Sequence, residues 1–195
     1  MDMQTFVREE EVIKMNAELA LNNDFTLSYI KNLPEHTRAE LIDGRIFYFA
    51  APSINHQRLV GDLYFKIRNH IEFMSGECKV YVSPVAVILS EDEQNYLEPD
   101  VIVVCDPAKL KEDGCHGAPD LVIEVTSKST QKRDYGLKMA KYRSSGVKEY
   151  WVVDAQRQVI MVYWFENETL NELHGLHEEI ESHLFPGLKI QLTTT

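Results

Sequence analysis

The stretch LEPDVIVVCDPAKLKEDGCHGAPDLVIEV, residues 97–125, decides the fold that we expect for this chain. It contains two apolar runs, at residues 101–105 and 121–125, that are typical of strands buried on both faces. Asp100 stands at the start of the first run, and Glu124 lies near the end of the second. An isolated charge inside such a strand is costly, so Glu124 needs a partner. A metal ion shared with Asp100 is the most economical partner, and the pair therefore predicts a metal-dependent enzyme.

The composition indicates one globular domain. The chain has 195 residues, of which 44% are hydrophobic and 26% are charged, so it is long enough to bury a core. No stretch approaches the roughly 20 apolar residues of a membrane span, and the N-terminus lacks the apolar region of a signal peptide. The cysteines Cys78, Cys105 and Cys115 have neither metal-type nor redox-type spacing. We therefore expect reduced thiols in a cytoplasmic protein that has no membrane partner.

The net charge of −11 argues against a protein that coats nucleic acid without sequence preference. The charge is unevenly distributed, because residues 128–148 contain seven basic side chains and one acidic side chain. This basic segment directly follows the strand that carries Glu124. It is compatible with a substrate that bears phosphate, and equally with the solvated face of a helix.

The order of the expected elements predicts an α/β fold. Residues 1–24 are expected to form a helical appendage to a domain that spans residues 25–195. Asp43-Gly44 lies between two apolar runs and is a strong hairpin signal. The other expected elements are a helix at 26–33, a helix at 55–76 capped by Asn55, strands at 80–89, 101–105 and 121–125, a helix from Ser129 or Thr130 to about Gly146, and strands at 146–154 and 158–165. This order favours helices packed on both sides of a mixed sheet.

Three further segments have weaker patterns. Residues 109–117 are predicted to form a loop, and residues 171–176 a turn. Residues 183–192 are predicted to form a closing edge strand.

Two carboxylates on neighbouring strands and one lysine are the minimum for metal-assisted cleavage of a phosphodiester. Mg²⁺ takes one or two carboxylates together with water and substrate oxygens, and a lysine can stabilise the developing charge. Asp120 is a rival to Asp100, but it precedes Glu124 by four residues on the same strand. The two are then about 13 Å apart, at about 3.3 Å per residue. Because that separation is too large for one ion, Asp100 is the expected partner of Glu124.

A series of motifs runs along the chain in a fixed order: ELIDG at 40–44, Pro52-Ser53 with His56, EPD at 98–100, PDLVIEVTSKST at 119–130, Asp134…Lys138…Tyr142, and GVKEYWVVD at 146–154. Together they resemble the Uma-two family of restriction-endonuclease-like proteins, in the PD-(D/E)XK nuclease superfamily. The resemblance covers residues 25–192 and implies a restriction-endonuclease-like fold, with a central mixed sheet flanked by helices. It also implies DNA as substrate and Mg²⁺ or Mn²⁺ as cofactor, with Asp100, Glu124 and Val125 in the metal site.

The sequence departs from the general nuclease motif at one position. Thr126 stands two residues after Glu124, where the motif has a lysine. The resemblance implies that Lys138 of the following helix takes over this role, because Asp134, Lys138 and Tyr142 share one helix face. The alternative for Lys138 is a surface ion pair with Asp134, which would contribute little to stability.

Glu40 and His56 complete the set of candidate catalytic residues, with Asp100, Glu124 and Lys138. Glu40 of the ELIDG motif would supply a third carboxylate, or it is an exposed strand acid beside the hairpin turn. His56 would hydrogen-bond a site carboxylate or water, or it caps the helix that it opens.

Three functions are compatible with these residues. The first is a Mg²⁺- or Mn²⁺-dependent DNA endonuclease, for which a homodimer would bring two sites to two strands. The second is a catalytically inactive module of the same fold that binds nucleic acid or a protein, which the acidic charge balance favours. The third is a metal hydrolase that acts on a small phosphate ester.

Overall fold

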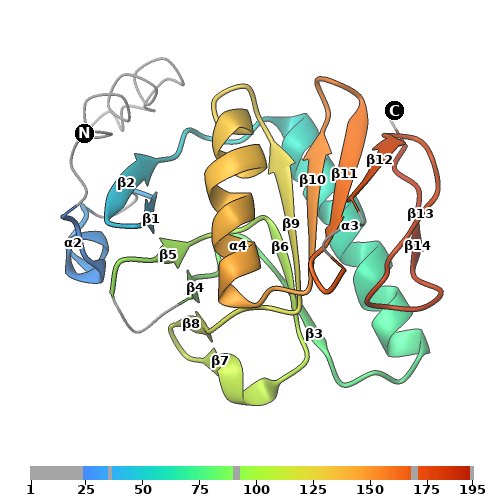
Figure 1. The fold of residues 1–195 in the computed structure, drawn as a ribbon, viewed down its shortest axis with the longest axis horizontal. Helices are drawn as coiled ribbons and strands as arrows, with labels where there is room; N and C mark the ends of the chain where they lie inside the picture. Colours follow the sequence, from blue (N-terminus) through green and yellow to red (C-terminus); the bar gives the residue numbers. More distant parts are fainter. Residues whose placement is uncertain (1–23, 35–36, 90–92, 168–170, 194–195) are drawn as a thin grey trace, which may run out of the picture.

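The computed structural model describes residues 24–34, 37–89, 93–167 and 171–193 (Figure 1). The helical appendage expected at residues 1–24 therefore lies outside the described residues, except for residue 24 itself. Among the described helices, none is both long enough and apolar enough to cross a membrane.

The core is built on a six-stranded mixed sheet. Its strand order is β12-β11-β10-β9-β6-β3, in which β9 and β10 are parallel and the other neighbours are antiparallel. The strands are β3 (Lys79–Val82), β6 (Val101–Val104), β9 (Leu121–Thr126), β10 (Glu149–Asp154), β11 (Val159–Trp164) and β12 (Asn171–Gly175). The central strands β6, β9 and β10 are buried along their whole length, as their continuous apolar runs predict.

Helices cover both faces of this sheet, so the expected α/β fold is confirmed (Figure 1). α3 (Ile54–Phe73) packs Leu59 and Leu63 against one face. The other face is covered by a helix made of a π-helical segment, η2 (Arg133–Lys138), and α4 (Met139–Ser145). Successive residues of β6 and β9 enter the two apolar clusters alternately, since side chains of a strand point to opposite faces.

A second sheet of shorter strands lies beside the first, in the order β2-β1-β5-β4-β8-β7. The Asp43-Gly44 turn joins its first hairpin as predicted, with positive φ angles of 49° and 72° at the two turn residues. The strands are β1 (Ala39–Ile42), β2 (Arg45–Tyr48), β4 (Val87–Ile88), β5 (Tyr96–Leu97), β7 (Leu110–Lys111) and β8 (Gly114–His116). The described chain also contains α2 (Leu27–Lys31), within the helix expected at 26–33, and a 3₁₀ turn, η1 (Pro107–Lys109).

Several expected boundaries are wrong. The strand expected at 80–89 divides into β3 and β4, which belong to different sheets, and Pro84 lies between them without an N–H to donate. The loop expected at 109–117 contains the β7–β8 hairpin. The α3 helix ends at Phe73 rather than near residue 76, and Ser53 caps it rather than Asn55, because the Ser53 side chain accepts the N–H of His56.

The C-terminal predictions also need correction. The turn expected at 171–176 is the strand β12, which pairs with β11 over five residues. The edge strand expected at 183–192 is replaced by a separate pair, β13 (Ile180–Glu181) and β14 (Lys189–Ile190). In both cases main-chain pairing forms the strand, whereas the side-chain pattern gives little signal.

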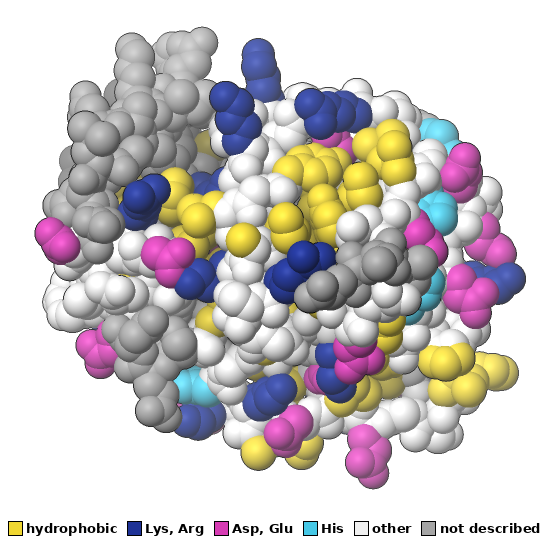
Figure 2. All heavy atoms as spheres, in the orientation of Figure 1, with side chains coloured by type: hydrophobic (Ala, Val, Ile, Leu, Met, Phe, Trp, Pro, Cys, Tyr) yellow, Lys and Arg dark blue, Asp and Glu magenta, His cyan; other side chains and the backbone are white. Residues whose placement is uncertain are grey.

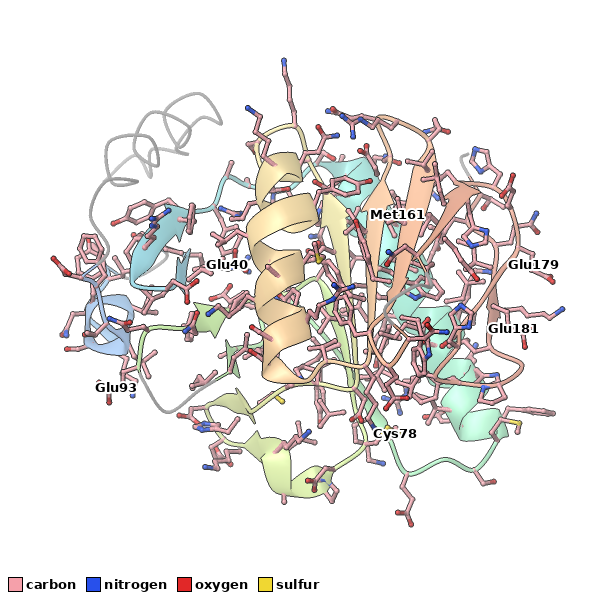
Figure 3. The ribbon with its side chains drawn as sticks, in the orientation of Figure 1. Glu40, Cys78, Glu93, Met161, Glu179 and Glu181 are labelled. Atoms are coloured by element: carbon pink, nitrogen blue, oxygen red, sulfur yellow. A yellow bond between two sulfur atoms is a disulfide. The ribbon has the colours of Figure 1, made fainter. Side chains whose placement is uncertain are left out.

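The expectation of reduced cysteines is wrong for two of the three. Cys78 and Cys105 form a disulfide, and among the described cysteines Cys115 alone is free, in a buried position. Cys78 directly precedes β3 and Cys105 directly follows β6. Because these strands are antiparallel, with Lys79 opposite Val104, the two cysteines meet at one end of the sheet. Figure 3 shows Cys78 at the lower end of the molecule, away from Glu40.

Candidate functional site

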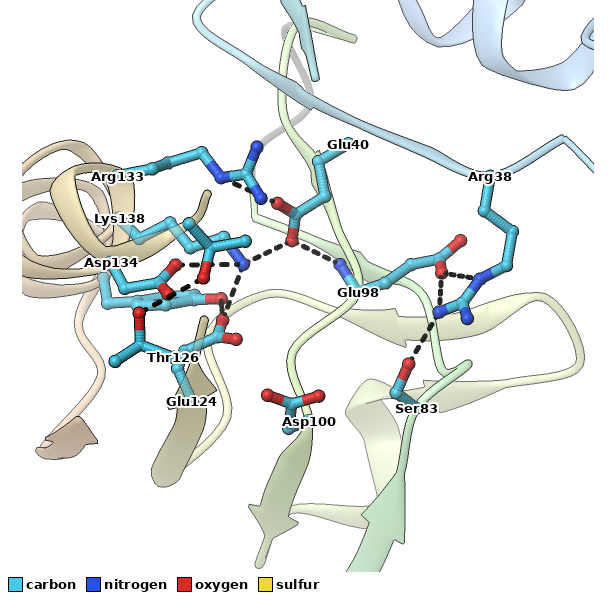
Figure 4. A network of polar contacts seen from close by, with 12 residues as sticks. Arg38, Glu40, Ser83, Glu98, Asp100, Glu124, Thr126, Arg133, Asp134 and Lys138 are labelled. Carbon is cyan, nitrogen blue, oxygen red and sulfur yellow. Dashed lines mark hydrogen bonds and ion pairs between the residues drawn. The ribbon is translucent and has the colours of Figure 1, made fainter. Parts of the chain in front are cut away.

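A cavity of about 520 Å³ opens beside the end of β9 and the starts of β6 and α3. Its lining includes Asp100, Glu124 and Lys138, together with the start of α3 at Ser53 and His56. The structure therefore brings four of the five predicted catalytic residues to the wall of one cavity, together with the predicted metal-site residue Val125. Glu40, the fifth, lies directly behind this wall in contact with Lys138 (Figure 4).

The strand register brings Asp100 and Glu124 together. In the antiparallel pair of β6 and β9, Val101 lies opposite Ile123, so one step further along the register Asp100 faces Glu124. The Oδ2 atom of Asp100 accepts the N–H of Val125 at 2.8 Å. The predicted metal-site residue Val125 thus meets Asp100 through its main chain, while its side chain packs in the core.

Glu124 lies deeper than Asp100 and is held by two donors. Its Oε1 atom accepts hydrogen bonds from Lys138 Nζ and from the hydroxyl of Tyr142, each at 2.8 Å. Burial raises the pKa of the Glu124 carboxyl well above its usual range, while the charge of Lys138 opposes that shift. The ionised form of the Glu124 carboxyl in this buried position therefore depends on the positive charge of Lys138.

Lys138 is the centre of a buried ion cluster (Figure 4). Its Nζ atom lies 2.6 Å from Glu40 Oε1 and 2.8 Å from Glu124 Oε1, and Asp134 is 3.9 Å away. Burial lowers the pKa of the Lys138 amine, but Glu124 and Glu40 outweigh burial and raise it above its ordinary value. The side chain is 2% exposed, so the alternative of a surface pair with Asp134 does not describe this lysine.

Glu40 is completely buried, so it is not the exposed acid that one interpretation of the sequence predicts. Its Oε1 atom accepts the N–H of Glu98 at 3.0 Å as well as the Lys138 amine. Glu40 and Glu124 therefore hold Lys138 from two different sheets. This arrangement ties the β1–β2 hairpin to β9 through the helix.

His56 combines the two roles that the sequence leaves open. Its main-chain N–H takes part in the cap of α3, and its Nε2 atom lies 3.3 Å from Asp100 Oδ2. Burial lowers the pKa of His56, but the hydrogen bond and charge of Asp100 outweigh burial and raise it above 6.5. The start of α3 thus holds the carboxylate at the start of β6.

Residues 24–194 match the model of the Uma2 family, which is described as "Putative restriction endonuclease". The chain belongs to the Uma2 family. Two Synechocystis sp. proteins are similar to it, both named as uncharacterized. The protein slr1290 is 28% identical over 134 residues, covering 69% of each chain, and sll1609 is 29% identical over 150 residues, covering 74% of this chain and 83% of the relative.

The fold of this Uma2 chain is similar to that of a solved structure from Anabaena variabilis, a "putative nuclease belonging to DUF820". The TM-score is 0.69, and the likeness covers 86% of this chain and 94% of the other. The sequence identity is 18%, so this likeness shows the fold alone.

The sequence of this Uma2 chain does not reveal all the side chains at the site. Arg133 lines the cavity and lies 3.6 Å from Glu40. In the sequence it is one of seven basic residues in the segment 128–148, and nothing in the pattern distinguishes it from the others. Glu98 lies in the EPD motif, and its carboxylate binds Arg38 rather than the proposed metal site. Asp120 accepts the N–H of Cys105 and pairs with Lys148, which agrees with its exclusion from the metal site on distance.

The donor chemistry of the site fits a hard divalent cation. No group of three or more His, Cys, Asp or Glu side chains with metal-binding geometry is present among the described residues. Within the described part of the chain, the contacts to Glu124 end on Oε1 and those to Asp100 on Oδ2, so one oxygen of each carboxylate is left for a ligand. Two carboxylate oxygens, completed by water and substrate oxygens, are a set that Mg²⁺ accepts.

Proposed function

We propose that this Uma2 chain is a Mg²⁺- or Mn²⁺-dependent endonuclease that hydrolyses phosphodiester bonds in DNA. The observation that carries the proposal is the pair of carboxylates from neighbouring strands at the wall of one cavity, Asp100 and Glu124, with an ammonium group 2.8 Å from the second. Family membership supports the same reaction class. The combination is the one that metal-assisted phosphodiester cleavage requires.

In this proposal Asp100 and Glu124 hold the ion, and the main-chain oxygen of Val125 is a third candidate ligand. The bound ion would polarise the phosphoryl group and lower the pKa of a coordinated water. Each protein ligand is oriented by a neighbour. Asp100 is held by His56 and by the N–H of Val125, and Glu124 is held by Lys138 and Tyr142. Such outer contacts fix the direction in which ligand oxygens point.

The role proposed for Lys138 is charge stabilisation. Its amine stays protonated at neutral pH because two buried carboxylates surround it. A fixed positive charge beside the reacting phosphate favours the transition state, in which negative charge develops. Glu40 positions this amine and, in the proposal, does not itself bind the ion.

We further propose that the protein acts as a homodimer on duplex DNA, since one site per chain favours a pair of chains for cutting two strands. Light scattering coupled to size exclusion would measure its mass in solution. A monomer under cleavage conditions would contradict this part of the proposal and leave the chemistry untouched.

The metal assignment is tested by thermal unfolding during titration with Mn²⁺. A ligand that binds only the native state raises the melting temperature. We expect an increase for the wild type and for Glu112→Gln, which removes an exposed carboxylate outside the cavity. Asp100→Asn and Glu124→Gln should abolish the increase. An unchanged wild-type melting temperature, or the same increase in all four proteins, would contradict the metal site.

Catalysis is tested by nicking of supercoiled plasmid in Mn²⁺, Mg²⁺ or EDTA. We expect metal-dependent nicking that Glu124→Gln eliminates and Glu112→Gln preserves. Activity that survives Glu124→Gln would exclude the mechanism. Metal-induced stabilisation without nicking would favour the inactive binding module instead.

A further inference from the structure

Arg133 presents unused hydrogen-bond donors to the cavity. Its side chain is 9% exposed and lines the cavity wall, and its guanidinium makes no hydrogen bond within the described residues. The Nε atom is buried beside Glu40, so the terminal nitrogens Nη1 and Nη2 are the donors that can reach the cavity. The closest carboxylate contact is Glu40 Oε2, at 3.6 Å, which is beyond hydrogen-bond length. A guanidinium carries five donors, and leaving such donors unpaired in a buried place is costly. The arrangement therefore suits an incoming acceptor.

Aromatic rings hold this guanidinium without occupying its donors. Its central carbon lies 5.0 Å from the ring centre of Phe47 and 5.7 Å from that of Phe49. Cation–π contacts of this kind use the face of the guanidinium and leave the N–H groups at its edge available. The hairpin that carries Phe47 thus orients Arg133 in advance of binding.

The other cations at the cavity are engaged or peripheral. Arg38 lies on the same Phe49 ring, at 5.3 Å, but it donates to Glu98 from Nε and Nη2 and to Ser83 from Nη2. Lys138 is held by two carboxylates. Lys128 also lines the cavity but belongs to an exposed position. Arg133 is therefore the buried cation here with the largest unused donor capacity.

Glu40 connects Arg133 to the proposed catalytic lysine, Lys138. Its Oε1 contacts Lys138, and its Oε2 faces Arg133 (Figure 4). Glu40 thus lies between Arg133 and Lys138, the lysine that is proposed to stabilise charge on the reacting phosphate. Lys138 in turn contacts Glu124. A second anionic group of the same substrate would meet Arg133.

We infer that Arg133 binds a backbone phosphate of DNA next to the phosphate that is cleaved. This inference rests on the proposed function. The planar guanidinium matches a phosphate group through two parallel hydrogen bonds. Lys and Arg side chains also gather along the upper edge of the molecule, over the start of the η2–α4 helix (Figure 2). The whole chain nevertheless carries a charge of −11, so local contacts such as this one must supply much of the attraction for DNA.

The test is fluorescence anisotropy with a fluorescein-labelled DNA oligonucleotide, single-stranded and duplex, in EDTA at several salt concentrations. Arg133→Gln should weaken binding about tenfold or more, because a charge-assisted hydrogen bond is lost. It should also reduce the slope of log affinity against log salt by about one. Arg133→Lys should keep that slope and recover only part of the affinity, since lysine lacks the planar pair of donors.

Two variants serve as matched controls. Lys132→Gln removes the neighbouring exposed charge from the same helix, and Arg143→Gln removes an arginine that packs over Phe165 outside the cavity. Arg143→Gln should bind nearly as tightly as the wild type, and Lys132→Gln should lose clearly less affinity than Arg133→Gln. An affinity and a salt slope of Arg133→Gln equal to those of Lys132→Gln would overturn the inference. In the wild type, the Nη–H resonances of the Arg133 guanidinium should shift when oligonucleotide is added, and resonances that stay in place would also overturn it.

The outcomes separate this inference from the proposed function, because binding is measured without metal and without cleavage. Loss of binding in Arg133→Gln together with an absence of nicking in Mn²⁺ would keep the phosphate contact and reject the nuclease. Nicking that requires Glu124, together with unchanged binding in Arg133→Gln, would keep the nuclease and reject the phosphate contact.

Discussion

Lys138 lies 2.8 Å from Glu124 although the two residues are 14 positions apart and belong to different layers of the fold. Thr126, which holds the position of the lysine in the general nuclease motif, contacts the Thr130 hydroxyl instead. The amine therefore reaches the carboxylate from a helix packed on the sheet rather than from the strand itself. Helix packing and site geometry are consequently coupled through one buried side chain.

The first prediction concerns the stability that this coupling provides. Lys138→Met would leave Glu40 and Glu124 buried without their shared counter-ion, and breaking a buried pair costs about 3–5 kcal/mol. The control is Lys141→Met, which removes an ion pair with the more exposed Asp43 and should cost less than about 1 kcal/mol. Urea unfolding measures both. Equal losses for the two variants would show that the Lys138 cluster contributes no more than a surface pair.

Tyr142 gives a second prediction, because its hydroxyl donates to Glu124 from a fully buried position. Tyr142→Phe removes one donor and leaves the packing intact, so the free energy of unfolding should fall by about 1–3 kcal/mol. Tyr163→Phe is the control, since Tyr163 is only partly buried and packs beside Tyr150 through its ring. It should change stability by less. Equal stability losses in the two phenylalanine variants would show that the hydrogen bond from Tyr142 to Glu124 contributes no more than the hydroxyl of Tyr163.

The parts of the fold that follow from the sequence are those that burial dictates. The strands β6 and β9 lie within one residue of the strands predicted at 101–105 and 121–125, and β10 begins three residues after the start of the strand predicted at 146–154. They could be predicted because a strand buried on both faces is largely apolar. The β7–β8 hairpin and β12 are different. Their side chains are largely polar, and they are strands because a neighbouring main chain pairs with them. Such pairing leaves little trace in a local pattern.

The site residues also fall into two groups, those that buried strands predict and those that only the packing of helices brings together. Asp100 and Glu124 could be paired from the sequence because each accompanies a neighbouring buried strand. The contact of His56 with Asp100 and that of Arg133 with the hairpin depend on how α3 and the η2–α4 helix pack on the sheet. No local spacing encodes that packing. The Cys78–Cys105 disulfide is a further case, because only the register of β3 and β6 brings the two cysteines together.

The disulfide gives a third prediction. In the denatured, unreduced protein, iodoacetamide should modify one cysteine, Cys115, and after reduction it should modify all three. Reduction should also lower the melting temperature. The bond joins residues separated by 27 positions, which corresponds to about 3.5 kcal/mol in the chain-entropy model. Cys78→Ser should show no response to reductant. Three reactive cysteines before reduction would contradict the bond.

The last prediction concerns the pH dependence that His56 introduces. Asp100 raises the pKa of His56 above its ordinary value of 6.5 although burial acts in the opposite direction. Protonation of His56 then favours the folded state. Its contribution to stability is complete below pH 6.5 and is lost as the pH rises through the folded-state pKa.

Two measurements check this dependence. Titration of the His56 ring by NMR should give a lower pKa in Asp100→Asn than in the wild type, while Glu112→Gln should leave it unchanged. In parallel, the stability difference between wild type and His56→Gln should shrink as the pH is raised above 6.5, because the wild type loses its protonated imidazole. The same His56 pKa in Asp100→Asn as in the wild type would show that Asp100 does not hold the ring. In that case His56 would be only the first-turn residue whose main chain takes part in the cap of α3.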